Sequence, residues 1–189
     1  MKKLFLYAAL GLTALSSLTW LTACGDDDDE NANVWEKYAD NRQANQQWLD
    51  QEENRRNPDG TKFYERLTPP WNPGEYILIH WFNNRAETAG NLRPLLTSSV
   101  RVWYVGRNSS YQVFDADSTS TDGTFFKVNS VVSGWQTALQ NMHVGDTVQV
   151  LLPYSQAYGS SQPNSLIPPY SALQFNIRLL DVPTYEVRP

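Results

Sequence analysis

The chain has 189 residues and a formal net charge of −5, from 15 lysines and arginines against 20 aspartates and glutamates. An acidic chain without a cluster of basic residues predicts no binding to nucleic acid or to an anionic lipid surface. Its single cysteine excludes an intrachain disulfide and a cysteine-based zinc site, so the fold must depend on a hydrophobic core.

Residues 1–23 have the pattern of a secretory signal. Two lysines, Lys2 and Lys3, precede an apolar run that ends in Leu-Thr-Ala-Cys at residues 21–24. The run is too short and wrongly flanked for a lasting membrane span. The tetrapeptide resembles the lipobox of bacterial lipoproteins, which implies that Cys24 becomes the lipidated first residue of the mature chain. The alternative is that Cys24 is an ordinary small residue of the signal.

Residues 24–32 are expected to form an acidic tether. Residues 25–30 read Gly-Asp-Asp-Asp-Asp-Glu, and a block of like charges repels itself and stays solvated. The stretch resembles the acidic segment that follows the lipidated cysteine in surface-exposed lipoproteins of Bacteroidetes, although a plain hydrophilic spacer is the alternative. We therefore expect a protein anchored by lipid to the bacterial cell envelope, at the outer membrane, with the periplasmic and surface faces both left open.

Residues 33–73 are predicted to form a helical extension. From Asn33 to Asn54 the chain is polar, and its large apolar residues are Trp35, Tyr38, Trp48 and Leu49, at loosely helical spacing. So thin an apolar stripe does not stabilise an isolated helix, so we expect the helix to lie against the main domain or a partner through its two tryptophans. Three prolines at residues 69, 70 and 73 place the domain boundary before Gly74.

Residues 74–189 are predicted to form an α+β domain. Four segments rich in strand-forming residues, 76–82, 100–105, 147–152 and 173–179, predict strands, and three of them alternate apolar and polar residues. Alternation is typical of an antiparallel sheet with one solvated face. Only residues 135–142 favour a helix. One short helix cannot connect several parallel strands, so we predict an antiparallel sheet with a single helix packed on one face.

Six short motifs in this domain resemble the FKBP-type peptidyl-prolyl cis/trans isomerases. Residues 131–142, Val-Val-Ser-Gly-Trp-Gln-Thr-Ala-Leu-Gln-Asn-Met, resemble the family signature V-I-x-G-W-x-x-x-L-x-x-M. Residues 102–106 and 113–115 resemble its V-x-Y-x-G and V-F-D motifs. Residues 157–159 resemble A-Y-G, and residues 167–175 contain I-P-P followed by L-x-F. The resemblance implies a strongly bent antiparallel sheet wrapped around one short helix.

The resemblance also implies a proline-binding pocket. Trp135 is expected to form its floor, while the backbone N–H of Val132 and the hydroxyl of Tyr158 contact substrate carbonyls. Asp115 is expected to bond to a pocket tyrosine or to face the twisted amide. The residues expected to be catalytic are Tyr104, Phe114, Asp115, Phe126, Trp135, Tyr158 and Phe175, and those expected to bind substrate are Val131, Val132 and Ile167.

Most of these side chains would also suit an ordinary hydrophobic core, but Asp115 and Tyr158 are polar groups that a core does not need. Phe126 is chosen over its neighbour Phe125, although loop lengths vary before the signature. The chain departs from the family pattern at residues 108–111 and in the Ser/Thr-rich loop 117–124, which puts substrate preference in doubt.

Little in the chain points to other chemistry. His80 and His143 have no carboxylates at metal-ligand spacing, and there is neither a Gly-rich phosphate loop nor a G-x-S-x-G motif. We therefore expect no metal and no cofactor. Asp115 and Asp117 form an i,i+2 carboxylate pair, which the V-F-D motif explains better than a catalytic dyad does.

The favoured function is a prolyl isomerase that assists folding of envelope or surface proteins, with proline-containing polypeptides as partners and macrolides as ligands of the same pocket. The main alternative is a chaperone or interaction module that binds proline peptides without turnover. A third hypothesis is a surface lipoprotein that binds glycan or protein through exposed tryptophans, namely Trp35, Trp48, Trp71 and Trp81. The sequence specifies neither client proteins nor an oligomeric state.

Overall fold

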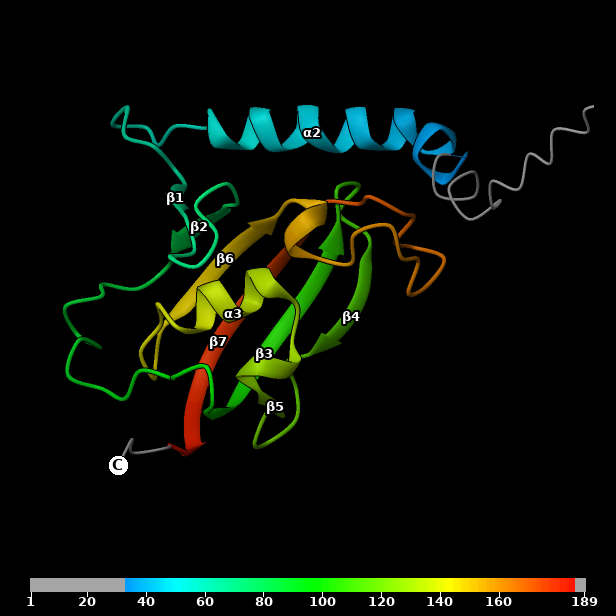
Figure 1. Cartoon of the computed structure of the whole chain (residues 1–189). Coiled ribbons are helices and arrows are strands. Elements are labelled where there is room, and N and C mark those ends of the chain that lie inside the picture. Colours follow the sequence, from blue (N-terminus) through cyan, green and yellow to red (C-terminus); the bar gives the residue numbers. More distant parts are fainter. Residues whose placement is uncertain (1–32, 186–189) are drawn as a thin grey trace, which may run out of the picture.

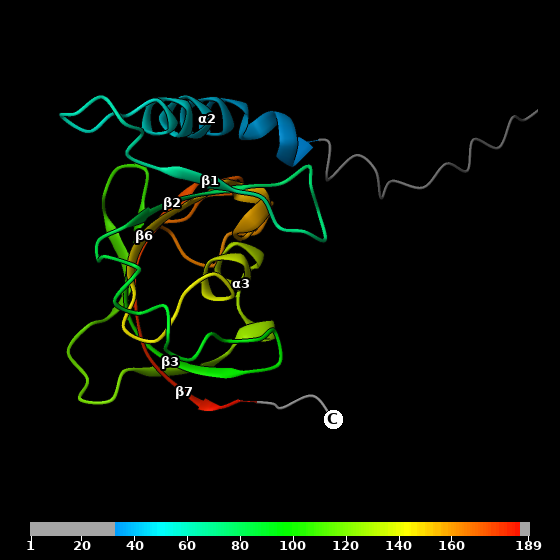
Figure 2. The same ribbon diagram turned by 90° about the vertical axis from the view of Figure 1, so that its left-hand side faces the viewer.

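The computed structural model describes residues 33–185. They form one bent seven-stranded antiparallel sheet in the order β1-β2-β6-β7-β3-β4, with β5 paired to β3. Helix α3 lies inside the bend and helix α2 lies across the outside of the sheet (Figures 1 and 2). The elements are α2 (Ala39–Glu53), β1 (Glu65–Leu67), β2 (Ile77–Trp81), β3 (Ser99–Asn108), β4 (Val113–Asp117), β5 (Thr124–Lys127), η1 (Val128–Ser130), α3 (Ser133–Leu139), β6 (Thr147–Leu152), η2 (Tyr154–Gln156) and β7 (Leu173–Thr184).

The predicted α+β class, with a bent sheet around one short helix, is confirmed. The four predicted strands correspond to β2, β3, β6 and β7, whereas the short strands β1, β4 and β5 were not predicted as strands. The helix predicted over residues 135–142 begins two residues earlier and ends at Leu139. Within residues 33–185, none of the helices combines the length and the apolar composition needed to cross a bilayer.

The concave face of the sheet holds the main core. Strands β3 and β7 pair along most of their length, and register shifts near Arg101 add to the bend of the sheet. Alternate residues of β3 point inward, so Val102 and Tyr104 lie opposite Leu179 and Ile177. Helix α3 covers this face with side chains that are almost fully buried, namely Trp135, Ala138 and Leu139.

Gly134 explains why α3 can lie so close to the sheet. A Cβ atom at this position would collide with the Leu152 side chain of β6 and come within 3.0 Å of the Gln156 carbonyl oxygen. The glycine of the Val-Val-Ser-Gly-Trp motif therefore lets the first turn of α3 rest on β6. This close approach sets the depth of the next residue, Trp135.

The expectation of one solvated sheet face is wrong at the β2–β6 end. Leu78 and Leu151 face each other across these strands, are fully buried, and pack with Tyr64 against Leu49 of α2. The extension before residue 74 thus supplies the cover of a second core, and it also contributes β1 to the sheet. Residues 33–73 are consequently part of the same packed unit as the rest of the described chain.

The tryptophans of the extension play a smaller part than expected. Leu49 is 3% exposed, whereas Trp48 is half-buried and Trp35 is 41% exposed. Both rings still pack on the domain, edge-on against Tyr111 and Tyr170 respectively. The docking of α2 therefore depends on one buried leucine and on contacts around it.

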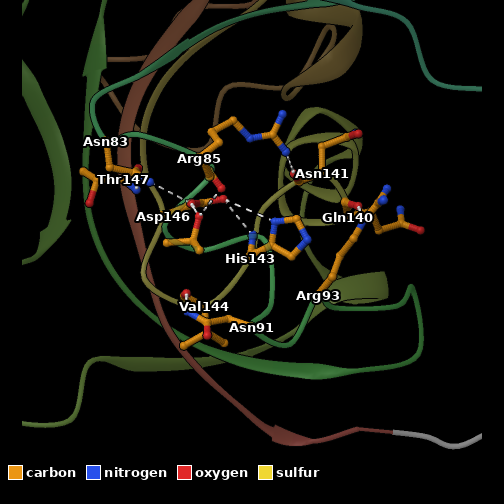
Figure 3. Close-up of polar contacts among 12 residues, drawn as sticks. Asn83, Arg85, Asn91, Arg93, Gln140, Asn141, His143, Val144, Asp146 and Thr147 are labelled. Atoms are coloured by element: carbon orange, nitrogen blue, oxygen red, sulfur yellow. Dashed lines mark hydrogen bonds and ion pairs between the residues drawn. The ribbon is translucent and has the colours of Figure 1, made fainter.

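A buried carboxylate anchors the long loop between β2 and β3 (Figure 3). Asp146 has no exposed surface, and its Oδ1 accepts hydrogen bonds from Asn83 Nδ2 at 2.9 Å and Thr88 Oγ1 at 2.5 Å. Its Oδ2 accepts a hydrogen bond from the backbone N–H of His143 at 2.8 Å. The carboxylate thereby joins the β2–β3 loop to the turn that follows α3.

The same loop caps the C-terminal end of α3. Arg85 Nη2 donates to the carbonyl oxygen of Asn141 at 2.8 Å, and Arg93 Nε donates to that of Gln140. Positive side chains at a helix C-terminus satisfy carbonyl groups that lack partners within the helix and oppose the negative end of its dipole. The loop therefore fixes the C-terminal end of α3, the helix whose first turn carries Trp135.

Buried tyrosines make the fold sensitive to alkaline pH. Tyr64 is 2% exposed and donates its hydroxyl hydrogen to Gln149 Oε1 at 2.5 Å. Burial, followed by the nearby charge of Glu52, raises the pKa of Tyr64 well above the ordinary 10.0. The pKa of Tyr104 is raised as well, first by burial and then by its hydrogen bond to Asp115.

A raised folded-state pKa means that these tyrosines lose their protons in the unfolded chain first, near pH 10. The stabilisation that comes from the protonated tyrosines is therefore fully present below pH 10 and is lost as the pH rises above it. For Tyr64 the slope is up to about 1.4 kcal/mol per pH unit. Urea unfolding between pH 8 and pH 11 should show a flat free energy of unfolding and then a decline. The Tyr64→Phe variant should decline less steeply, and an equal slope in both proteins would contradict this account.

Candidate active site

A cavity of about 230 Å³ opens between α3 and strands β3, β4, β5 and β7. Its position follows from the bent sheet, which curls around the first turn of α3 without closing on it. The residues that line the cavity are Tyr104, Asp115, Phe126, Ser130, Val131, Val132, Trp135, Tyr158 and Phe175. Eight of these nine belong to the ten pocket residues predicted from the sequence.

Trp135 lies at the centre of an aromatic cluster. Its ring is 5.4 Å from Tyr104, 5.6 Å from Phe126 and 5.2 Å from Phe175, measured between ring centroids, and each pair is close to perpendicular. Edge-to-face geometry is the favourable arrangement for aromatic rings at these distances. Because Trp135 is only 4% exposed and three rings hold it, it forms a rigid apolar floor.

The alternation of β5 resolves the choice between two adjacent phenylalanines. Phe126 lines the cavity, whereas Phe125 points outward and is 49% exposed. Phe126 also lies 5.8 Å from Tyr104, so the two rings form one continuous wall.

The two other predicted residues lie behind the cavity. Phe114 packs edge-on against Phe175 at 5.5 Å, and Ile167 is 2% exposed within the main core. Neither side chain is among those that line the cavity, so both support its walls from behind. Gly106 makes room for this packing, because a Cβ atom there would come within 2.8 Å of both Phe114 and Phe175.

Ser130 is the lining residue that the sequence did not indicate. It ends the short 3₁₀ helix η1, directly before Val131 and Val132. A serine is common in loops and carries no periodic signal. Its position next to the Val-Val pair is the only feature of the sequence that points to it.

The polar groups of the site lie at the rim. Tyr104 donates its hydroxyl hydrogen to Asp115 Oδ2 at 2.8 Å, which holds the carboxylate on exposed strand β4 against the buried ring. The pKa of Tyr158 is also raised, first by burial and then by the charge of Asp115. Both phenols are therefore protonated at neutral pH. Tyr104 uses its hydrogen for Asp115, so the Tyr158 hydroxyl is the donor that a ligand can use.

Val132 brings the start of α3 to the cavity. It is the N-cap residue of α3, with extended backbone angles, and lines the cavity beside Val131. The first N–H groups of a helix have no carbonyl partner within that helix. The cavity thus combines an aromatic floor with the Tyr158 hydroxyl and the Asp115 carboxylate, next to the start of α3.

The two histidines lie away from the cavity. His80 stacks on Phe63 at 3.8 Å and its Nδ1 lies 2.7 Å from the carbonyl oxygen of the same residue, on the outer face of β2. His143 lies beside Asp146, with 3.9 Å between its Nδ1 and Asp146 Oδ2. In the described part of the chain, no three His, Cys, Asp or Glu residues are grouped as metal ligands.

Comparison with known proteins places this site in a family. Residues 90–180 match the family model described as FKBP-type peptidyl-prolyl cis-trans isomerase, and that range includes every residue that lines the cavity. The chain carries an FKBP domain. The FKBP match excludes α2, β1 and β2, so the packed unit extends beyond it on the N-terminal side.

Individual relatives agree with this assignment. The macrophage infectivity potentiator of Trypanosoma cruzi is 36% identical over 101 residues, which cover 53% of this chain and 52% of that protein. The FKBP-type 22 kDa peptidyl-prolyl cis-trans isomerase of Escherichia coli (strain K12) is 37% identical over 89 residues, covering 47% of this chain and 43% of that protein. This chain therefore matches about half the length of these relatives.

A solved structure extends the likeness beyond the FKBP match. The crystal structure of a peptidyl-prolyl cis-trans isomerase from Pseudomonas syringae pv. tomato superposes with a TM-score of 0.62 at 29% identity. The superposition covers 77% of this chain and 95% of that one.

Proposed function

We propose that this protein is a peptidyl-prolyl cis/trans isomerase that acts on proline-containing polypeptides in the cell envelope. The observation that carries the proposal is the small aromatic cavity floored by Trp135, with donors and a carboxylate at its rim, inside an FKBP domain. A volume of about 230 Å³ suits a single apolar ring, so a ligand of drug size or larger, whose pockets span about 300–1,000 Å³, would place only one part of itself in the cavity.

The reaction needs no nucleophile. Rotation about an Xaa-Pro bond is slow because it breaks the partial double bond, with a barrier of about 18–20 kcal/mol. The twisted amide has lost resonance, so its carbonyl is less polarised than that of the planar form. An apolar aromatic wall therefore disfavours the planar ground states more than the twisted one, and only such differential binding accelerates the step.

The rim groups add selectivity for the twisted form. The N–H of Val132 and the hydroxyl of Tyr158 are proposed to bind the carbonyls that flank the proline, while Asp115, held by Tyr104, faces the rotating amide. A ten-thousandfold acceleration requires about 5.5 kcal/mol, at 1.36 kcal/mol per tenfold. An aromatic cage with two or three hydrogen bonds is sufficient to supply that amount.

The Tyr104→Phe variant tests this arrangement. It keeps the ring against Trp135 but removes the hydroxyl that holds Asp115, so kcat/KM should fall about threefold to tenfold, as expected for one hydrogen bond at a half-open site. A protease-coupled assay on Xaa-Pro tetrapeptides measures this change. Tyr185→Phe is the matched control, because Tyr185 is 43% exposed and lies beyond β7.

The outcomes of this assay separate the candidate functions. No acceleration by the wild type, together with retained binding of proline peptides, would favour the non-catalytic binding module. Acceleration that is equal in wild type and Tyr104→Phe would retain the isomerase but show that the Tyr104–Asp115 hydrogen bond has no part in its mechanism.

We further propose that Cys24 is lipidated and anchors the protein to the envelope. Cys24 and the acidic tether lie outside the described residues, so the support comes from the Leu-Thr-Ala-Cys motif after an apolar run. Fractionation of cells that express Cys24→Ser should move the protein from the membrane fraction to the soluble fraction. We also propose macrolides as ligands of the cavity, and competition between a macrolide and a proline peptide would test it.

A further inference from the structure

The loop between β6 and β7 carries Tyr158 and is folded back on itself. The backbone N–H of Tyr170 donates to the carbonyl oxygen of Gly159 at 2.8 Å, which ties the end of the loop to the residue after Tyr158. Tyr170 itself has a φ of 62°, in the left-handed region that residues other than glycine rarely adopt. Such a conformation persists only where the surroundings hold it.

Helix α2 provides two of the contacts that hold this residue. Asn41 Nδ2 donates to the carbonyl oxygen of Pro169 at 2.8 Å, and Asn45 Oδ1 accepts from the backbone N–H of Ala172 at 2.9 Å. Asn45 is 4% exposed and also donates to Asn41 Oδ1 at 2.9 Å. The two amides are hydrogen-bonded to each other and hold the loop at two points, one on each side of Tyr170.

Aromatic packing fixes the side chain of Tyr170 as well. Trp35, from the helical turn at residues 33–37, packs edge-on against it at 5.2 Å. Tyr154, at the start of the same loop, packs against it at 5.4 Å. Arg42 of α2 lies over the Trp35 ring, 3.2 Å from its centroid, and 5.4 Å from the centroid of Tyr170.

The helix also reaches the turn before β4, the strand that carries Asp115 of the cavity. Trp48 Nε1 lies 3.4 Å from the hydroxyl oxygen of Tyr111, in the turn that leads into β4 and Asp115. Asn108, at the end of β3, joins this turn to the β6–β7 loop by donating to the carbonyl oxygen of Leu166 at 3.1 Å. Figure 1 shows α2 running above both segments.

We propose that α2 positions the cavity wall that carries Tyr158, and that Asn41 and Asn45 are positioning residues of the active site. The inference rests on the proposed isomerase function. Loss of the hydrogen bonds from Asn41 and Asn45 would release Tyr170 from its left-handed conformation and break its hydrogen bond to Gly159. Tyr158 would then lose its place at the rim while the sheet and the Trp135 floor stay intact.

The Asn41→Asp variant removes one contact with almost no change of shape. It replaces the donor that faces Pro169 by an oxygen, which repels the carbonyl there, and it keeps the acceptor for Asn45. Gln47→Glu is the matched control, since it adds the same charge to the exposed side of the same helix. We expect kcat/KM for an Xaa-Pro peptide to fall threefold to tenfold in Asn41→Asp and to stay unchanged in Gln47→Glu.

A double-mutant cycle separates positioning from a general loss of structure. If Asn41 acts through Tyr158, Asn41→Asp should reduce kcat/KM in the wild-type background but have almost no effect in the Tyr158→Phe background. A reduction of equal size in both backgrounds, or no reduction in either, would overturn the inference and leave the isomerase function standing. Failure of the wild-type protein to accelerate isomerisation would instead overturn the proposed function.

A second variant and a second measurement keep the test decisive. Asn41→Ala replaces Asn41→Asp in the same cycle if the added charge prevents folding. Amide hydrogen exchange at Tyr170 and Ala172 should be faster in the Asn41 variant than in wild type, with exchange in β3 unchanged. Unchanged exchange at both amides would also overturn the inference, because the loop would then be held without α2.

Discussion

Replacing Trp135 with alanine is expected to lower kcat/KM at least tenfold and to lower the free energy of unfolding by about 3–5 kcal/mol. The ring is 4% exposed, and three other aromatic rings lie 5.2 to 5.6 Å from it. Its removal leaves a void beneath the cavity and removes the surface on which a prolyl ring would rest. Urea unfolding and an isomerase assay, run at a temperature where the variant stays folded, measure the two effects separately.

Two further variants control this experiment. Trp135→Phe keeps an apolar aromatic floor and should retain more of both the activity and the stability. Trp71→Ala, at a residue that is 56% exposed, should change neither. Full activity in the folded Trp135→Ala protein would show that the floor of the cavity has no part in catalysis.

Replacing Asp146 with alanine is expected to lower the free energy of unfolding by about 2–4 kcal/mol. The side chain is fully buried and accepts hydrogen bonds from Asn83, Thr88 and the backbone of His143. Its removal takes one shared acceptor away from three buried or partly buried donors, and a buried donor without a partner costs far more than an exposed one. Chemical denaturation followed by tryptophan fluorescence measures the change.

The matched control is Asp181→Ala, because Asp181 is an exposed aspartate on β7. Asp146→Asn should lie between the wild type and Asp146→Ala, since it keeps one oxygen as an acceptor. A loss below about 0.5 kcal/mol, which is the range of ordinary surface substitutions, would mean that the β2–β3 loop is not anchored by this carboxylate.

The main sheet could be predicted because its long strands carry a regular signal. Val100, Val102 and Tyr104 alternate along β3, and four similar positions alternate along β7, so inward and outward faces are distinct in the sequence. Strands β1, β4 and β5 have only three to five residues each, which is too few for a period of two to stand out.

The second core, between α2 and strands β2 and β6, was not predicted because the pattern that indicates it spans only three residues in each strand. Ile77, Leu78 and Ile79 are consecutive apolar residues, and so are Val150, Leu151 and Leu152. Such runs are typical of strands covered on both faces. Given together, they favour a layer over the outer face at this end of the sheet, and α2 is that layer.

Most of the cavity could be predicted because its residues belong to short motifs in a fixed order. The motifs do not indicate, however, which side chains line the cavity and which lie behind its wall. They include Phe114 and Ile167, which lie behind the wall, and they omit Ser130, which lies on it. The prediction of Cys24 as the lipidated residue stays a prediction, since it concerns a part of the chain outside the described residues.

The contacts between α2 and the β6–β7 loop could not be predicted from the sequence. Asn41 and Asn45 bond to backbone atoms 128 and 127 residues further along the chain. An asparagine in a polar helix has many partners available in solution, so its residue type does not indicate which one it takes. Only the three-dimensional structure brings these amides to Tyr170.

Exchange NMR on a proline peptide that populates both isomers tests the central claim most directly. Unassisted exchange takes about 10–100 s. With the protein present at about one-hundredth of the peptide concentration, we expect exchange within about 1 s. A hundredfold acceleration of the whole peptide pool then requires about a ten-thousandfold acceleration of the bound peptide, or about 5.5 kcal/mol. Exchange that stays on the unassisted timescale, while the folded protein binds the peptide, would contradict the assignment of the Trp135 cavity as an isomerase site.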